Sequence, residues 1–479
     1  MRLSTLGPEG TQRIDQAARR ILERTGVEIP HAEMQSLFRQ AGANVDVSSR
    51  RVRIPSSVVD QCLRTAGKTF TIYGRDRGLR AAFGVGQRSY NTTAGQAHWV
   101  EGSGDRRFAS LDDVAAAAKI GDVLPMINIV GAMADPHELD VSWRCVDVAA
   151  TLLRTTTKPV TFWFHDGPSA AYLVQLMDVV TAGQTREFPP AYPLLEPISP
   201  LRFPTNGIDV LLETCKVPLP VHIGPMAQLG LSAPATIAGT LAQETAEILA
   251  GVCVTQLIRP GTPVCFGGIP HVFDMKTTQL VFSGPEQGLM AVAMTEMGRH
   301  YGLPVYINVG LTDSKTVDAQ AGLEIGVSLV LGALAGADIF GHFGICGVDQ
   351  GASLEMLVFQ HEVIEFVERI LRGFQIDDET LALDLIDAVG PGGSFIAEDH
   401  TLRHFRQELW MPKLLDRLFW DAWVARGRAD TLQRARRPLE SLIASYEPKP
   451  LPADVERQVA ELVARAKRDL ARTRPIPRP

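Results

Sequence analysis

The sequence of 479 residues lacks the features that mark several protein classes. Its six cysteines form no Cys-x-x-Cys pair, which argues against a zinc-thiolate site and a disulfide scaffold and predicts reduced thiols. No apolar run near the N-terminus is typical of a signal peptide, and the longest uncharged stretch of small and apolar residues, 326–337, is too short to span a bilayer. We therefore expect a cytoplasmic protein without a membrane segment.

The chain also has little that would bind nucleotides or nucleic acids. No strand-like segment is followed by Gly-x-Gly-x-x-Gly or by a phosphate-binding loop. The net charge is −7, although residues 426–479 carry 13 lysines and arginines against 7 acidic residues, and this balance argues against binding through nucleic-acid phosphates. The apolar content of 45% and charged content of 21% are typical of globular proteins and predict a sizeable core.

Residues 1–110 have a mixed pattern and are expected to form an N-terminal α+β extension. An amphipathic helix near the start, a second helix over residues 31–41 and a third that begins at Pro55 are predicted from apolar spacing and turn signals. Short β-branched and aromatic runs at residues 70–74, 80–84, 88–93 and 97–102 are separated by glycines and charged turns. These runs predict a small antiparallel sheet.

From residue 111 short apolar runs alternate with long helical patterns, which is typical of βα units on a parallel sheet. We predict seven strands, over residues 127–133, 159–164, 191–196, 219–224, 263–268, 304–309 and 337–342. Their spacing favours an α/β (β/α)₈ TIM barrel over residues 111–400, with an eighth strand near residues 392–397. An open doubly wound sheet is the alternative. Residues 401–479 are predicted to form a helical C-terminal segment.

Side chains that follow the predicted strands should gather at one end of a barrel, because barrel active sites lie at the carboxyl ends of the strands. This set is rich in aromatic and imidazole groups, although aromatic residues make up only 7% of the chain. Its members are Trp163, Phe164, His165, Glu196, Arg202, His222, Phe266, His271, Tyr306, His342 and Phe343.

Three interpretations of this set remain open. The aromatic rings would bind a quaternary ammonium group, which accepts no hydrogen bond but is attracted to ring faces. Alternatively, His165, His222, His271 and His342 would ligate a metal, although no short His-x-His or His-Glu-x-x-His spacing supports this. The third interpretation is that these side chains only fill the barrel interior. Strand alternation favours Phe164 over Trp163 as the ring that faces the interior.

A polar loop follows the predicted strand at 304–309 and is longer than a simple βα connection requires. It begins at Asn308 and contains Asp313, Lys315 and Asp318. Excess polar residues at a barrel mouth indicate binding or catalysis, and we interpret Asn308, Asp313 and Lys315 as candidate catalytic residues. The alternative is a local role, in which Asp318 caps the next helix and its neighbours brace the loop.

Four stretches carry a resemblance to a known family. They are GPEGTQRIDQAARRILERTGVEI (7–29), EPISPLRF (196–203), INVGLTDSKTVDAQAGLE (307–324) and HTLRHFRQELWMPKL (400–414). The chain resembles the trimethylamine methyltransferase superfamily, whose members demethylate methylated amines with a corrinoid protein. All 479 positions are ordinary amino acids, so the chain resembles the branch without pyrrolysine, which includes enzymes for glycine betaine and related quaternary amines.

The resemblance implies a methyltransferase that moves a methyl group from a quaternary amine to a cobalamin (corrinoid) carried by a partner protein. It implies no metal bound by this chain itself, a small-molecule amine substrate and a homo-oligomer without nucleic-acid or membrane partners. The aromatic set above would bind the substrate, and Arg202, His271 or His342 would hold a substrate carboxylate. Two alternatives are a metal-dependent TIM-barrel hydrolase and a non-catalytic protein that binds quaternary amines.

Overall fold

An eight-stranded parallel sheet forms the centre of the computed structural model, which describes residues 3–101 and 104–473. Its spatial order is β10-β9-β6-β18-β17-β14-β12-β11, so the sheet curls and brings the first strand of the set beside the last. In chain order the strands are β6 (Ser89–Thr92), β9 (Ile127–Gly131), β10 (Val160–Thr161), β11 (Leu194–Leu195), β12 (Val221–Ile223), β14 (Val264–Gly268), β17 (Val305–Ile307) and β18 (Ile339–Phe343).

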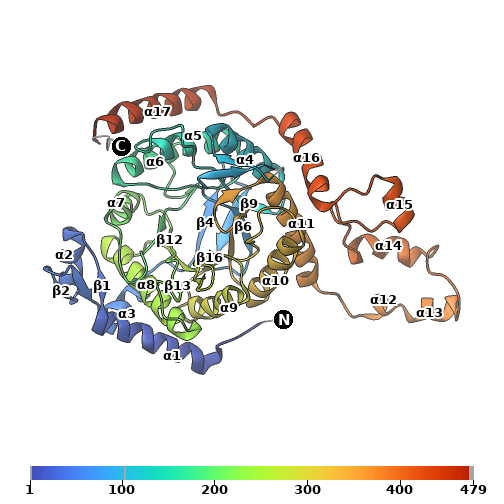
Figure 1. Ribbon diagram of the computed structural model, residues 1–479, viewed down its shortest axis with the longest axis horizontal. Coiled ribbons are helices and arrows are strands. Elements are labelled where there is room, and N and C mark those ends of the chain that lie inside the picture. Colours follow the sequence, from blue (N-terminus) through green and yellow to red (C-terminus); the bar gives the residue numbers. More distant parts are fainter. Residues whose placement is uncertain (1–2, 102–103, 474–479) are drawn as a thin grey trace.

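A helix follows each strand, and these helices surround the sheet (Figure 1). They are α4 (Leu111–Val123), α5 (Arg144–Thr155), α6 (Gly167–Val180), α7 (Thr205–Thr214), α8 (Ile237–Ile258), α9 (Pro285–His300), α10 (Ala319–Ala335) and α11 (Leu354–Arg372). Among the described residues β10 and β11 form no ladder with each other, and one backbone hydrogen bond, from Val160 N–H to Pro190 O at 2.9 Å, links the two edges. The architecture is a curled parallel α/β sheet that lacks one ladder of a closed barrel.

Seven of the eight strands lie where the sequence predicts them, and the eighth does not. Residues 392–397 form no strand and are exposed. The eighth strand is β6, which was expected in a separate antiparallel sheet, and its four residues are all buried although three of them are polar. A buried polar strand gives no apolar signal, which explains the error. The main sheet therefore begins before the expected boundary at residue 111, and residues 378–400 contribute nothing to it.

The N-terminal region contains the three predicted helices, and all three pack against α8. Its elements are α1 (Gly7–Arg20), a π-helical turn (Ile21–Thr25), β1 (Val27–Glu28), α2 (Ala32–Gln40), β2 (Asn44–Asp46), β3 (Arg51–Arg53), α3 (Ser56–Thr65), β4 (Phe70–Tyr73) and β5 (Arg80–Phe83). The β4–β5 hairpin places Ile72 and Phe83 in one buried cluster with Ile129 and Ile339 of the central sheet. It thus covers the end of the sheet opposite the strand exits.

Helix α8 is long and apolar enough, by length and composition, to cross a membrane. However, 83% of its apolar window is buried within the protein, and α1, α3 and α9 pack around it. This burial is typical of the core helix of a globular fold. Glu244 and Glu247 interrupt its apolar run, so the helix does not stand out in the sequence as an uncharged stretch.

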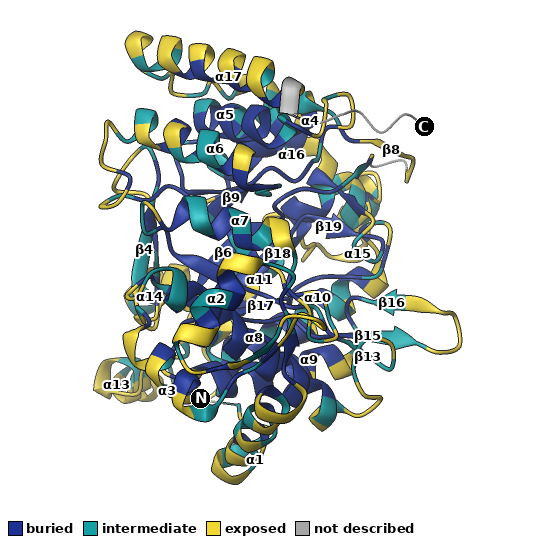
Figure 2. Ribbon diagram, turned by 90° about the vertical axis from the view of Figure 1, so that its left-hand side faces the viewer, coloured by how far each residue is buried: buried dark blue, intermediate teal, exposed yellow. Residues whose placement is uncertain are grey.

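The C-terminal region is helical from residue 378, before the expected start at residue 401, and its last two helices return to the body. Its helices are α12 (Asp378–Leu381), α13 (Leu383–Val389), α14 (Asp399–Glu408), α15 (Trp420–Ala425), α16 (Thr431–Ser445) and α17 (Ala453–Thr473). Helix α16 packs on α4 and α11 and α17 packs on α5 and α6, whereas α12 to α15 project from the body (Figure 1). Figure 2 shows the contrast between the buried central strands and the exposed outer helices α1, α13 and α17.

Short strands decorate the exits of the central sheet. They are β7 (His98–Val100), β8 (Arg106–Phe108), β13 (Gln228–Leu229), β15 (His271–Asp274), β16 (Gln279–Val281), β19 (Ile345–Cys346) and β20 (Gly351–Ala352). They pair as β19-β20-β7-β8 and β13-β15-β16, so the loop after β6 is tied to the loop after β18, and the loop after β12 to the loop after β14. The mouth at the carboxyl ends of the strands is therefore an ordered surface.

Candidate functional site at the carboxyl ends of the strands

The segment that leaves β18 has a strained backbone. His342, Val348 and Asp349 have φ values of 71°, 60° and 60°. Positive φ is unfavourable for residues with a Cβ atom, and most of all for a branched side chain such as valine. Such conformations persist only where the surroundings fix them, and they are frequent at functional sites. The surroundings therefore hold the backbone of this exit in a conformation that it would not adopt alone.

Rings and imidazoles form a floor beneath the mouth. The ring centroid of Tyr306 lies 4.1 Å from that of His222 and 5.7 Å from that of His342, and Trp163 stacks 6.5 Å from His342. Burial raises the pKa of the Tyr306 phenol, and it lowers the pKa of His222 to about 3 and that of His342 to about 4. All three groups are consequently neutral near pH 7.

Two glycines make space for this floor. A Cβ atom at Gly341 would lie 1.5 Å from Tyr306 Oη, and one at Gly267 would lie 2.2 Å from His222 Nε2. Between the rings a cavity of about 10 Å³ remains, which is roughly the room needed for one water molecule. A ligand larger than water must therefore bind above the floor, at the mouth.

Two carboxyl groups at this mouth, those of Glu196 and Asp349, interact electrostatically. Glu196 follows β11, and solvent reaches its side chain although protein surrounds it. Partial desolvation by this protein and the charge of Asp349 raise the pKa of Glu196 to about 7. Burial raises the pKa of Asp349 to about 6, opposed by a hydrogen bond of 2.8 Å from Gln96 Nε2. Glu196 also acts on the Tyr306 phenol, which places it near the floor. The two carboxyl groups thus give the mouth a partial negative charge at neutral pH.

A second group of polar contacts lies behind β17. The His271 ring stacks on Phe282 with centroids 4.4 Å apart, and Asn308 Nδ2 lies 3.5 Å from His271 Nε2. Asp313 Oδ1 accepts a hydrogen bond of 2.8 Å from Phe282 N–H, which fixes the stack. Within the described residues Asn308 Oδ1 and His222 Nε2 are buried without a hydrogen-bond partner. Buried polar atoms that lack a partner indicate places where a ligand or water is expected to bind.

The polar loop after β17 is braced internally. Lys315 Nζ donates to Asp313 O at 2.9 Å, and Glu324 accepts from Thr312 Oγ1 and from Asp313 N–H. Asp318 caps α10 by accepting from Ala321 N–H, as the alternative interpretation of this loop expected. Asp313 and Lys315 therefore act first on the shape of the loop. Asp313 reaches the site through Phe282, and Lys315 is exposed at the rim.

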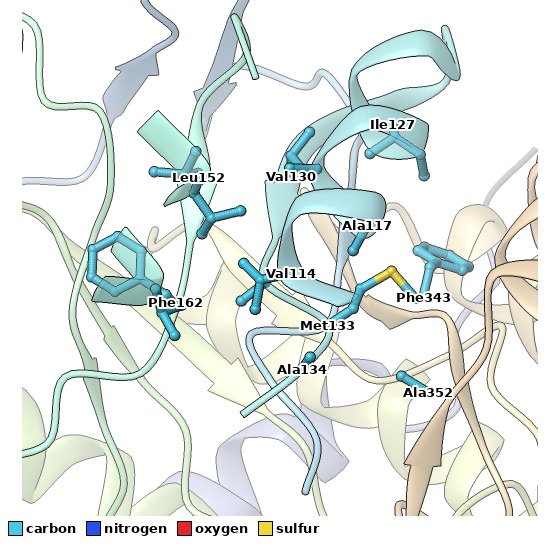
Figure 3. Close-up of a cluster of buried hydrophobic side chains, with 14 of the residues drawn as sticks. Val114, Ala117, Ile127, Val130, Met133, Ala134, Leu152, Phe162, Phe343 and Ala352 are labelled. Atoms are coloured by element: carbon cyan, nitrogen blue, oxygen red, sulfur yellow. The ribbon is translucent and has the colours of Figure 1, made fainter. Parts of the chain in front are cut away.

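Two of the expected substrate-binding rings point away from the mouth. Phe266 stacks against Tyr301 of the outer layer, with centroids 5.9 Å apart, because its neighbours Cys265 and Gly267 face the interior. Phe343 lies in the outer hydrophobic cluster beside Met133 (Figure 3). Strand alternation explains both errors, since successive side chains of a strand point to opposite faces.

Three other candidates have local partners. The Arg202 guanidinium is exposed and lies 3.9 Å from the Glu28 carboxylate, and its backbone pairs with Glu28 and Ile198. Phe164 is half-buried and stacks on Phe162. His165 Nδ1 lies 3.3 Å from Val141 O. The Arg202 guanidinium thus lies beside Glu28 of the N-terminal region.

Trp163, a member of the expected set, lines the floor, where its Nε1 donates to Gly95 O at 2.9 Å, although strand alternation favoured Phe164. Other residues of the site were not predicted from the sequence. Gln96 and Asp349 follow β6 and β18, and Asn91 lies on β6. Had β6 been recognised as a strand of the central sheet, Asn91 and Gln96 would have been candidates for the site, because they lie at or just after the carboxyl end of that strand. Asp349 could have been found from the glycine-rich segment after residue 342.

The four candidate metal-ligating histidines do not converge. His222 and His342 face the floor, His271 is held in the stack behind β17, and His165 lies against Val141. Among the described residues, the group of histidines and carboxylates close enough to share one ion is Glu379, His400 and His404, which comes from the C-terminal region. The arrangement at the mouth does not support the expected alternative of a metal-dependent hydrolase.

Sequence comparisons with known proteins show one family. The family description "Trimethylamine methyltransferase (MTTB)" matches residues 1–471. The glycine betaine methyltransferase of Desulfitobacterium hafniense (strain Y51) is 28% identical over 463 residues, covering 96% of each chain. The trimethylamine methyltransferase MttB2 of Methanosarcina mazei is 30% identical over 495 residues, covering 97% of this chain and 96% of that protein. The crystal structure of the Methanosarcina barkeri monomethylamine methyltransferase gives a TM-score of 0.49 at 12% identity, covering 97% of this chain and 92% of that one.

Proposed function

This chain belongs to the trimethylamine methyltransferase (MTTB) family and is a methyltransferase, and on this premise we propose that it transfers a methyl group from a quaternary amine to the cobalt of a corrinoid protein. The amine would bind at the mouth, above the floor of Trp163, Tyr306 and His342. The observation that carries the proposal is the pair of carboxyl groups, Glu196 and Asp349, beside neutral rings.

The electrostatics of the mouth favour a fixed positive charge. Burial raises the pKa of Asp349, and the surrounding protein together with the charge of Asp349 raises that of Glu196, so a bound cation would relieve the cost of ionising both. A quaternary ammonium accepts and donates no strong hydrogen bond, and its contact with an aromatic face contributes about 0.5–2 kcal/mol. The rings and carboxylates are complementary to such a group.

The chemistry asks little of the side chains beyond placement. A corrinoid protein, as methyl acceptor, would supply a nucleophilic cobalt atom at the mouth. When the C–N bond of a quaternary amine breaks, its electron pair stays on nitrogen and the tertiary amine leaves uncharged. No proton donor is required, so orienting the N–CH₃ bond and excluding water are the contributions left to Trp163, Glu196 and Asp349.

The catalytic assignments from the sequence become positioning roles in this proposal. Asp313 would hold the Phe282–His271 stack, and Asn308 would orient His271. Arg202, which lies beside Glu28, is not the residue we propose for a substrate carboxylate, and His342, which is neutral, would act only as a hydrogen-bonding group. Lys315 at the rim is the cation we propose for the carboxylate of a betaine-like substrate.

The test compares choline and glycine betaine with the neutral isostere 3,3-dimethyl-1-butanol, by titration calorimetry and by methylation of a corrinoid protein. Trp163→Ala is expected to weaken binding of the quaternary amines at least tenfold and of the neutral alcohol much less, since only the former has a cation–π term. Trp420→Ala is the matched control, because Trp420 is 74% exposed outside the site.

Two results would count against the proposal. Absence of methyl transfer from every quaternary amine, with binding intact, would favour the non-catalytic binding protein. Equal losses for the charged and neutral ligands in Trp163→Ala would show that the rings only provide apolar surface.

A further inference from the structure

Residues 374–409, here called the arm, have no core of their own. The arm contains α12, α13 and α14, and none of its residues is buried. It projects from the body in Figure 1, and Phe374 and Ile396 are 77% and 86% exposed. Helices of four to ten residues are marginal in water without tertiary support. Some contact other than apolar burial must therefore hold α12 against α14.

That contact is a cluster of one carboxylate and two imidazoles. His400 and His404 lie one turn apart on the same face of α14, with ring centroids 4.3 Å apart. His404 Nε2 lies 3.0 Å from Glu379 Oε1, and His400 Nε2 lies 3.0 Å from Glu379 O. One ligand atom from each of the three side chains lies within 4.8 Å of the others.

We propose that Glu379, His400 and His404 bind a divalent transition-metal ion, of which Zn²⁺ is the type case, and that this ion clamps α12 to α14. Imidazole nitrogen and carboxylate oxygen are preferred ligands of Zn²⁺, at about 2.0–2.2 Å. Two histidines four residues apart on a helix are a recurrent ligand pair, because both side chains point to one side. The sequence HTLRH carries this spacing within a stretch that the functional site does not use.

The charged side chains around the cluster favour binding of a cation, except for Arg403, which competes with the metal ion for Glu379. Asp378, Asp384, Glu398 and Asp399 line the same depression and contribute negative charge. Arg403 opposes binding, because its Nη2 lies 3.2 Å from Glu379 Oε1. Both side chains of that ion pair are more than half exposed, so it contributes little and is readily replaced by a metal–carboxylate bond. Three protein ligands leave a fourth tetrahedral position for water.

The experiment is titration of the full chain, stripped with a chelator, with Zn²⁺, Co²⁺ and Mg²⁺. We expect one site with a dissociation constant below about 10 µM for Zn²⁺, a tetrahedral Co²⁺ absorption spectrum, and no response to Mg²⁺, which prefers oxygen ligands. Binding should also slow proteolysis within residues 382–398. Binding only at millimolar Zn²⁺, or an octahedral Co²⁺ spectrum, would overturn the proposal.

Variants assign the ligands. His400→Ala and His404→Ala should each weaken Zn²⁺ binding at least tenfold, whereas His300→Ala, an exposed histidine on α9, should leave it unchanged. Arg403→Ala should strengthen binding, since it removes the competing cation. Unchanged affinity in the double variant His400→Ala/His404→Ala would place the ion elsewhere. Circular dichroism of each variant verifies that the body remains folded.

Discussion

The body of the molecule and the arm represent two ways of fixing side chains. At the mouth, buried side chains hold the loops through hydrogen bonds: Glu244 on α8, for example, accepts from Ala227 N–H and Ile269 N–H, which belong to the exits of β12 and β14. In the arm, no side chain is buried, and α14 is joined to α11 mainly through Arg369 and Arg372, which donate to carbonyls at its C-terminal end. Buried hydrogen bonds therefore fix the loops of the mouth, whereas the arm, with no buried residue, has none.

The largest expected effect is a loss of stability of the body. In Gly341→Ala the new methyl group would lie 1.5 Å from Tyr306 Oη, so the ring must leave the floor. Overpacking of a buried core costs roughly 1–3 kcal/mol and occasionally more, and we expect the upper end together with loss of ligand binding. Urea denaturation of the variant and of Gly326→Ala, where a Cβ meets nothing within 4 Å, provides the measurement and its control. Equal stability of the two variants would disprove the close packing of the floor.

A smaller effect concerns Glu247, which holds the loop after β11. Its carboxyl group accepts from Ser199 Oγ and Leu201 N–H, and burial raises its pKa to about 7. Because the folded-state pKa lies above the unfolded value, the stabilising protonated form is fully present below about pH 4.5, and its contribution is lost as the pH rises towards 7. Glu247→Gln keeps the shape without the charge. It should therefore gain about 2 kcal/mol of unfolding free energy over the parent at pH 8 and nothing at pH 4.

Urea midpoints from pH 4 to pH 8 test this, with Glu379→Gln as the exposed counterpart in the arm. Burial of Glu247 is the cause of its shift, so parallel pH profiles of the parent and Glu247→Gln would show that the carboxyl group is solvated.

The next effect concerns ligand binding, whose pH dependence should reflect the carboxyl groups of the mouth and not those of the arm. Glu196 and Asp349 have pKa values of about 7 and about 6, so both are largely protonated at pH 5 and ionised at pH 8. Choline should bind more tightly as the pH rises over this interval, by about tenfold or 1.4 kcal/mol. Glu196→Gln should flatten the profile, whereas Asp384→Asn in the arm should not. If choline binding to the parent protein is independent of pH, Glu196 and Asp349 do not contribute to the binding site.

The sequence predicted the order of the central elements because seven strands are apolar runs bounded by glycine or proline. It could not predict β6, whose buried serine, asparagine and threonine resemble a loop, and this error moved the eighth strand to residues 392–397. For the site, Tyr306 and His342 were found at the mouth, but Phe266 and Phe343 were assigned to the wrong face. Which residue of an alternating strand points inward depends on the small partners Gly267 and Gly341, and that requires the neighbouring strands.

The smallest expected effect lies in the arm. Ile396 is 86% exposed, so Ile396→Ser removes no buried contact from a single chain and should change the unfolding free energy by less than about 0.5 kcal/mol. By contrast, Gly341→Ala in the core of the body should cost close to the upper end of roughly 1–3 kcal/mol. Measured at low protein concentration, a loss above about 1 kcal/mol in Ile396→Ser would show that the arm packs against the body in solution. If a second copy covers the arm, as the expected homo-oligomer implies, the same substitution should leave stability at low concentration unchanged and lower the sedimentation coefficient at high concentration.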